Sequence, residues 1–124
     1  MYKGSSSPFD YMTWNGDTFL GLECKLLKSR KSGDPKSLPF GRIPQHQRDG
    51  LLKLEQYDNS KTYILCNFRW TSESGKGTLY ALSIGDFLRI EQKVDRKSIS
   101  LDMFDELAIN IDRYGKGWDL RSLL

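Results

Sequence analysis

The sequence is poor in the residues that build metal clusters and disulfide frameworks. It contains two cysteines, Cys24 and Cys66, and a single histidine, His46. Both cysteines lie in apolar, strand-like stretches, and neither a CxxC pair nor a Cys/His cluster is present. This pattern argues against a zinc site and predicts two buried, reduced thiols.

Long apolar runs are also missing. No stretch approaches the roughly 18 apolar residues of a membrane-spanning helix, and the N-terminus shows no signal-peptide core. We therefore expect a cytoplasmic protein with no membrane partner. The length of 124 residues predicts a single domain over residues 1–124.

Acidic residues are scarce in one part of the chain. Between Lys25 and Lys53, eight basic residues face only two acidic ones, Asp34 and Asp49, a local charge of +6 in a chain whose total is +3. Such a block predicts a polyanionic partner. The alternative is a solvated charged face, which is the commoner meaning of a charge run.

Periodicity and turn residues predict an α/β fold with a mixed sheet. Strands are expected at Phe9–Trp14, Asp17–Leu26, Lys61–Trp70 and Thr78–Leu82. Helices are expected at about Gln45–Tyr57, from the N-cap Ser83 to Gln92, and from the N-cap Ser100 to Ala108. The segment Leu27–Gly41 is expected to be a basic loop, and the tail from Asn110 receives no assignment.

Asn15-Gly16 is a strong signal for a two-residue hairpin turn. Such a turn would pair Trp14 with Asp17 and would set Asp10 opposite Gly21. Glu23 would then lie one diagonal step from Asp10, roughly 7–8 Å away at the backbone. Lys25, two residues further, would emerge on the same side of the sheet.

The intervening residues of this strand carry the core. Leu20, Leu22, Cys24 and Leu26 alternate with the polar positions and predict one apolar face. On the other face, Gly21 is expected to leave room for a metal ion, water or phosphate.

Two carboxylates and a lysine on one face suit metal-dependent phosphodiester chemistry. Mg²⁺ prefers carboxylate and water oxygens, and Mn²⁺ can replace it. A neighbouring lysine can orient the attacking water or stabilise charge on the phosphate. Asp10, Glu23 and Lys25 reproduce the spacing of PD-(D/E)xK nucleases, although the bare pattern also fits surface charges on an edge strand.

Several blocks of the chain resemble the RecU-type Holliday junction resolvases. Asp10-Tyr11, Asn15-Gly16 and Glu23-Cys24-Lys25 are similar to the family's Asp-Tyr-x-Gly hairpin and Glu-Ala-Lys strand. Ser37-Leu38-Pro39-Phe40, followed by Ile43 and His46-Gln47, resembles its Ser-Phe-Pro-Leu segment and the His-Gln at a helix start. Arg96-Lys97-Ser98-Ile99 resembles a segment before a late helix.

The resemblance implies a PD-(D/E)xK (restriction-endonuclease-like) core, a mixed β-sheet flanked by helices, and cleavage of branched DNA in recombination and repair. It implies Asp10 and Glu23 as metal ligands, with Lys25 and Gln47 completing the catalytic set. Contacts to DNA phosphates are expected from Lys28, Arg30, Lys31, Arg42, His46 and Arg48. The tryptophans Trp14, Trp70 and Trp118 could stack on bases, but packing is their commoner use.

The resemblance also implies a homodimer, because resolving a junction takes two symmetric nicks. Relative to the family, we expect a shortened member without the N-terminal helix, the acidic residue on that helix and the stalk, and Pro8-Phe9 stands where the family has a Thr-Thr pair. A partner chain supplying the missing acid is one expectation that follows. Two other interpretations stay open: a catalytically weak, structure-selective DNA-binding module, and a general PD-(D/E)xK nuclease acting on duplex DNA.

Overall fold

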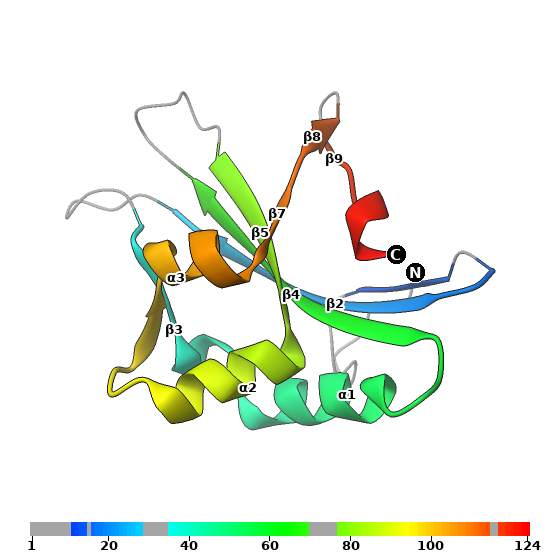
Figure 1. Cartoon of the computed structure of the whole chain (residues 1–124), viewed down its shortest axis with the longest axis horizontal. Coiled ribbons are helices and arrows are strands. Elements are labelled where there is room, and N and C mark those ends of the chain that lie inside the picture. Colours follow the sequence, from blue (N-terminus) through cyan, green and yellow to red (C-terminus); the bar gives the residue numbers. More distant parts are fainter. Residues whose placement is uncertain (1–10, 15, 29–34, 70–76, 115–116) are drawn as a thin grey trace.

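The fold is α/β, with a mixed five-stranded sheet and three helices (Figure 1). The computed structural model describes residues 11–14, 16–28, 35–69, 77–114 and 117–124. The strands are β1 (Tyr11–Trp14), β2 (Phe19–Leu27), β3 (Ser37–Pro39), β4 (Ser60–Arg69), β5 (Gly77–Ser83), β6 (Ser98–Ser100), β7 (Ile109–Ile111), β8 (Arg113–Tyr114) and β9 (Gly117–Trp118). The helices are α1 (Gln45–Glu55), α2 (Ile84–Lys93) and α3 (Leu101–Leu107), with 3₁₀ turns η1 (Phe40–Arg42) and η2 (Arg121–Leu123).

The sheet has the order β1-β2-β4-β5-β7. Strands β2 and β4 are parallel, from the pair Phe19–Ser60 to the pair Leu27–Phe68, and all the other neighbours are antiparallel. A parallel pair needs a crossover connection, which α1 provides between β2 and β4. Two small antiparallel pairs, β3–β6 and β8–β9, lie outside this sheet.

The helix starts follow the predicted caps. The Ser83 hydroxyl accepts a hydrogen bond from the Asp86 N–H at 3.1 Å, and Ser100 accepts one from the Met103 N–H at 3.3 Å. Helix α1 begins at Gln45 as expected and ends two residues earlier, at Glu55. The expected basic loop Leu27–Gly41 is wrong in part, because it contains the end of β2, strand β3 and most of η1.

The predicted hairpin register is wrong by two residues. Trp14 lies opposite Phe19 rather than Asp17, and Gly21 lies opposite Met12. Strand β2 begins at Phe19, where the Phe19 N–H also donates to the Asn59 carbonyl at 2.8 Å, so the pairing with β4 sets its start. Gly16 has the expected positive φ of 98°. A displacement by two keeps every side chain of β2 on its predicted side.

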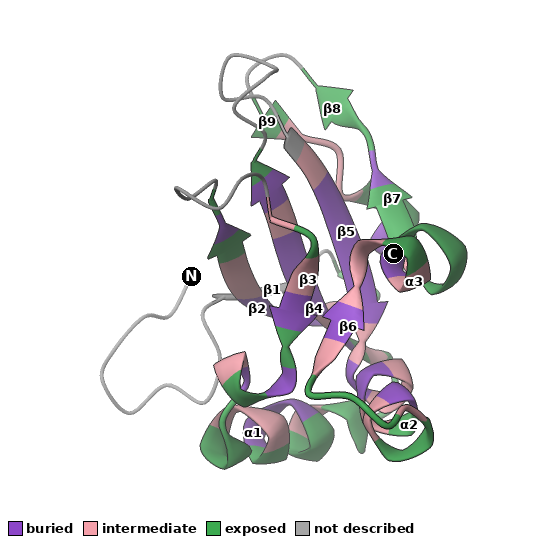
Figure 2. Cartoon of the chain, turned by 90° about the vertical axis from the view of Figure 1, so that its left-hand side faces the viewer, coloured by how far each residue is buried: buried purple, intermediate pink, exposed green. Residues whose placement is uncertain are grey.

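Two apolar clusters lie on opposite sides of the sheet. The first cluster joins Leu27 of β2 and alternate residues of β4 and β5 to all three helices and to β3 and β6, with Leu51, Phe87 and Phe104 fully buried. The second cluster contains Leu20 and Leu22 of β2 and other strand residues, and the chain beyond β8 covers it with Trp118, Leu120 and Leu123. The described helices therefore pack on one side only, and their outer faces are exposed (Figure 2).

Two details of β2 differ from expectation. Leu26, expected in the core, is 39% exposed, whereas Leu20 and Leu22 are buried and Cys24 is half-buried. Gly21 does not leave open space, because a Cβ there would lie 2.5 Å from the Leu54 Cδ2 and 3.4 Å from the Thr62 Cγ2. The glycine lets α1 approach β2 closely.

Among the described residues, no helix is both long enough and apolar enough to cross a membrane.

Gly21→Val should lower the free energy of unfolding by about 1–3 kcal/mol, because the added side chain overlaps Leu54. Urea denaturation would measure the change, and Leu54→Ala in the same chain should restore part of it. Gly41→Ala is the matched control, since a Cβ at Gly41 meets nothing within 4 Å. Equal effects at the two glycines would contradict the close-approach explanation.

Candidate functional site

Glu23 and Lys25 form an ion pair on the side of β2 that α1 covers. The Lys25 Nζ lies 3.2 Å from the Glu23 Oε1, and the two side chains are 14% and 1% exposed. Their neighbours in register on β4 are Ile64 and Cys66, both members of the first cluster. A buried carboxylate costs free energy unless a counter-charge accompanies it, and Lys25 provides that charge. The expectation that Lys25 emerges on the same face of the sheet as Glu23 is confirmed.

The second predicted metal ligand is not placed. Asp10 lies outside the described residues, as do the expected phosphate contacts Arg30 and Lys31. Within the described part of the chain, no three His, Cys, Asp or Glu side chains gather closely enough to hold a metal ion. Glu23 itself offers the hard oxygen donor that Mg²⁺ and Mn²⁺ prefer, so its chemistry fits a divalent cation.

Gln47 lies in the first turn of α1, the helix that packs on β2 and β4. Its backbone N–H donates to the Pro44 carbonyl at 3.0 Å, and its side-chain Oε1 is buried without a hydrogen-bond partner. A buried amide oxygen without a partner can accept from a bound water or an ammonium group. Gln47 therefore keeps an unused acceptor on the helix that covers Glu23 and Lys25.

Cys66 is a neighbour of the site that the sequence did not reveal. It is the register partner of Lys25, and its side chain is fully buried. Burial raises the pKa of the Cys66 thiol to about 12, and the nearby charges of Arg42 and Lys25 offset this rise only in part. Arg42 also donates to the Leu26 carbonyl at 3.5 Å. Lys25 and Arg42 thus bring two cations to the C-terminal half of β2.

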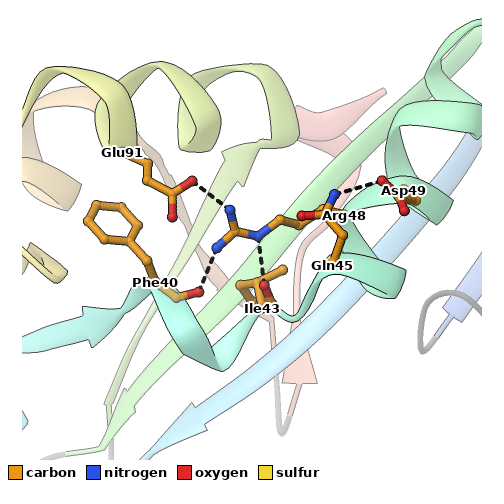
Figure 3. A network of polar contacts seen from close by, with 6 residues as sticks. All are labelled: Phe40, Ile43, Gln45, Arg48, Asp49 and Glu91. Carbon is orange, nitrogen blue, oxygen red and sulfur yellow. Dashed lines mark hydrogen bonds and ion pairs between the residues drawn. The ribbon is translucent and has the colours of Figure 1, made fainter.

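Arg48 is committed to internal contacts. Its Nε donates to the Ile43 carbonyl at 2.7 Å, its Nη2 to the Phe40 carbonyl at 2.9 Å, and its Nη1 to the Glu91 carboxylate at 2.5 Å (Figure 3). The guanidinium carbon also lies 4.9 Å from the centre of the Phe87 ring. Arg48 therefore ties η1 and α1 to α2. Its phosphate contact stays a prediction.

The other predicted phosphate contacts differ in exposure. Lys28, after the end of β2, and His46, in the first turn of α1, are exposed. Arg42 is half-buried at the end of η1. Next to His46, the Gln45 amide donates to the Asp49 carboxylate at 2.8 Å along the outer face of α1 (Figure 3). Lys28, Arg42 and His46 remain available to a polyanion.

No protein-family model matches the chain, and a search of curated proteins finds no match. A function is therefore inferred from the residues and their geometry.

Arg48→Met should lower the free energy of unfolding by about 2–4 kcal/mol, because it removes the donor of the Ile43 carbonyl and of Glu91 and one of two donors to the Phe40 carbonyl. Urea denaturation would measure the loss. Arg121→Gln is the control: among the residues that the structure describes, the Arg121 side chain pairs with Asp119, two residues away, and its loss should barely change the free energy of unfolding. An Arg48 variant as stable as the control would contradict the internal role.

The Cys66 thiol should react slowly in the folded protein. In a Cys24→Ser background, modification by a thiol reagent at pH 8 should be roughly 100-fold slower than in the urea-unfolded chain, because burial removes both access and thiolate. With an aromatic disulfide as the reagent, the absorbance of the aromatic thiolate that it releases would measure the rate. Equal rates in the folded and unfolded chains would show that Cys66 is accessible.

Proposed function

We propose that this protein is a metal-dependent DNA endonuclease of the PD-(D/E)xK class that cleaves branched DNA. One observation carries the proposal: the buried Glu23 forms a 3.2 Å ion pair with the half-buried Lys25 on a strand of a mixed sheet, on the face packed against α1. The antiparallel pair β1–β2, followed by α1 and the parallel strand β4, is compatible with such a core. The clustering of a carboxylate and a lysine supports metal-assisted hydrolysis.

Glu23 and Asp10 are the proposed ligands of Mg²⁺, with Mn²⁺ as a substitute. Tyr11 lies opposite Leu22, Asp10 precedes Tyr11 in the sequence, and Glu23 follows Leu22. Each carboxylate residue is thus the sequence neighbour of one member of the Tyr11–Leu22 pair. This relation supports Asp10 as the second ligand. A bound divalent ion would polarise the scissile phosphate and acidify a water molecule.

Lys25 is the proposed catalytic lysine. Its ammonium group, held beside Glu23, can donate to a phosphate oxygen or orient the attacking water. The free acceptor of Gln47 can hold that water from the side of α1. Both roles need the donor or acceptor group to be held in one position. Strand β2 carries Lys25 and helix α1 carries Gln47, and side chains on such rigid elements are positioned more precisely than side chains on loops.

Phosphate contacts are proposed for the basic residues around the site. Lys28, Arg42 and His46 carry this role among the described residues, with Arg30 and Lys31 proposed from the sequence. Such contacts position DNA without reading its sequence. A homodimer is proposed for junction substrates, since two symmetric nicks need two sites. A partner chain that supplies a further acidic residue is part of the same proposal.

Glu23→Gln should reduce cleavage of a labelled four-way DNA junction by about 100-fold or more while leaving its binding intact, because the substitution removes charge but little volume. Cleavage would be followed on gels with Mg²⁺, Mn²⁺ or EDTA, beside a linear duplex of the same sequence. Normal cleavage by the variant would show that Glu23 is not part of the catalytic site. Equal cleavage of junction and duplex would favour a general duplex nuclease.

A catalytically weak DNA-binding module is the second candidate, and the enclosure of the site favours it. Glu23 is 1% exposed and already paired with Lys25, as in a purely structural ion pair. Replacing both partners by apolar residues, Glu23→Leu with Lys25→Met, should keep the fold, because an apolar pair often substitutes for a buried ion pair. A wild-type protein that never cleaves, but binds DNA as this double variant does, would establish the module.

A further inference from the structure

A cavity of about 210 Å³ opens between helices α2 and α3, which pack on the same side of the sheet (Figure 1). Four apolar side chains form its floor and wall: Ile90, Val94, Met103 and Leu107. Ile90 is buried, at 6% exposure, whereas Leu107 is 49% exposed. The cavity therefore extends from the edge of the first cluster to the solvent.

The shape of the cavity follows from the spacing of these residues. Ile90 and the C-cap residue Val94 are four residues apart, as are Met103 and Leu107, so each pair lies on one face of its helix. Val94 and Met103 also pack against the first cluster, which makes the floor continuous with the core. The volume is below the roughly 300–1,000 Å³ of ordinary ligand pockets, and no aromatic side chain is among the described residues that line it. Such a space suits a short aliphatic chain.

Three charged residues of α2 also line the cavity. Asp86, Arg89 and Lys93 follow one another along roughly 10 Å of the helix axis. Arg89 forms an ion pair with Asp86, so these two charges compensate each other. Within the described residues, no hydrogen bond or ion pair engages the ammonium group of Lys93. The charge that remains at the cavity is therefore positive.

The other charged residues of α2, of α3 and of the segment between them do not line the cavity. The Glu91 carboxylate accepts a hydrogen bond from Arg48, and the Asp105 carboxylate accepts one from the Tyr80 hydroxyl. The remaining ones are exposed: Asp95, Arg96, Lys97, Asp102 and Glu106. Water and salt screen exposed charges that a ligand does not touch, so the lining ammonium decides which charge the cavity attracts.

We propose that the cavity between α2 and α3 binds a small aliphatic carboxylate. The chain lies on the apolar floor between Ile90 and Leu107, and the carboxylate lies beside the Lys93 ammonium. Leaving water favours the chain, and a hydrogen bond between two charged groups fixes the orientation of the ligand. The proposal goes beyond the nuclease proposal, because it needs neither a metal ion nor Glu23.

The test is a titration of the whole chain with hexanoate, hexanol and hexylammonium, followed by the NMR signals of the Met103 and Leu107 methyl groups. The three ligands share one chain and differ in the charge of the head. Hexanoate should bind about two- to fivefold more tightly than hexanol, as an exposed ion pair allows, and hexylammonium should bind most weakly.

Lys93→Glu should weaken hexanoate binding by at least about threefold and should favour hexylammonium. Lys53→Glu is the matched control, since Lys53 is also an exposed lysine in the last turn of a helix, α1, but does not line the cavity. Leu107→Ala should weaken all three ligands alike, because it shortens the apolar wall. Its control is Leu52→Ala, at a leucine of α1 that is 37% exposed.

Four results would overturn the proposal. They are no methyl shift with hexanoate, equal affinities for the three ligands, equal losses in Lys93→Glu and Lys53→Glu, and methyl shifts that follow protein concentration alone. The last result would assign the cavity to a second copy of the chain. Failure here is distinguishable from failure of the nuclease site, because no DNA is present and Glu23→Gln should bind hexanoate like the wild type.

Discussion

The rest of the structure depends on one constraint, the ion pair of Glu23 and Lys25. This pair lies in a strand that buries side chains on both faces of the sheet. Strand β2 lies between β1 and β4, with Leu20 and Leu22 in one cluster and Glu23 and Lys25 on the side of the other. The ammonium beside the carboxylate makes this burial tolerable. Gly21 then allows α1 to lie close on the same face, and that position of α1 brings Gln47 to the side of the sheet that holds the pair.

Local chemistry made part of this arrangement predictable. The hydroxyls of Ser83 and Ser100 fixed two helix starts, and the two-residue period of a strand placed Glu23 and Lys25 together. The register of the hairpin was not local. Asn15-Gly16 favours a two-residue loop, but the bond between the Phe19 N–H and Asn59 begins β2 later, and that partner is 40 residues away in the sequence. Strand β3 escaped prediction for the same reason, because its partner β6 follows about 60 residues later.

Charge counted along the chain differs from charge presented on the surface. The basic segment from Lys25 to Lys53 predicted one polyanion-binding block. In the structure, however, Lys25 forms an ion pair with Glu23, and Arg48 donates hydrogen bonds to Glu91 and to two backbone carbonyls. No local pattern could have paired Arg48 with Glu91, since 43 residues separate them. Conversely, Arg69 and Arg113 lie outside the basic segment, and only the register of β4, β5 and β7 reveals that they reach the same end of the sheet.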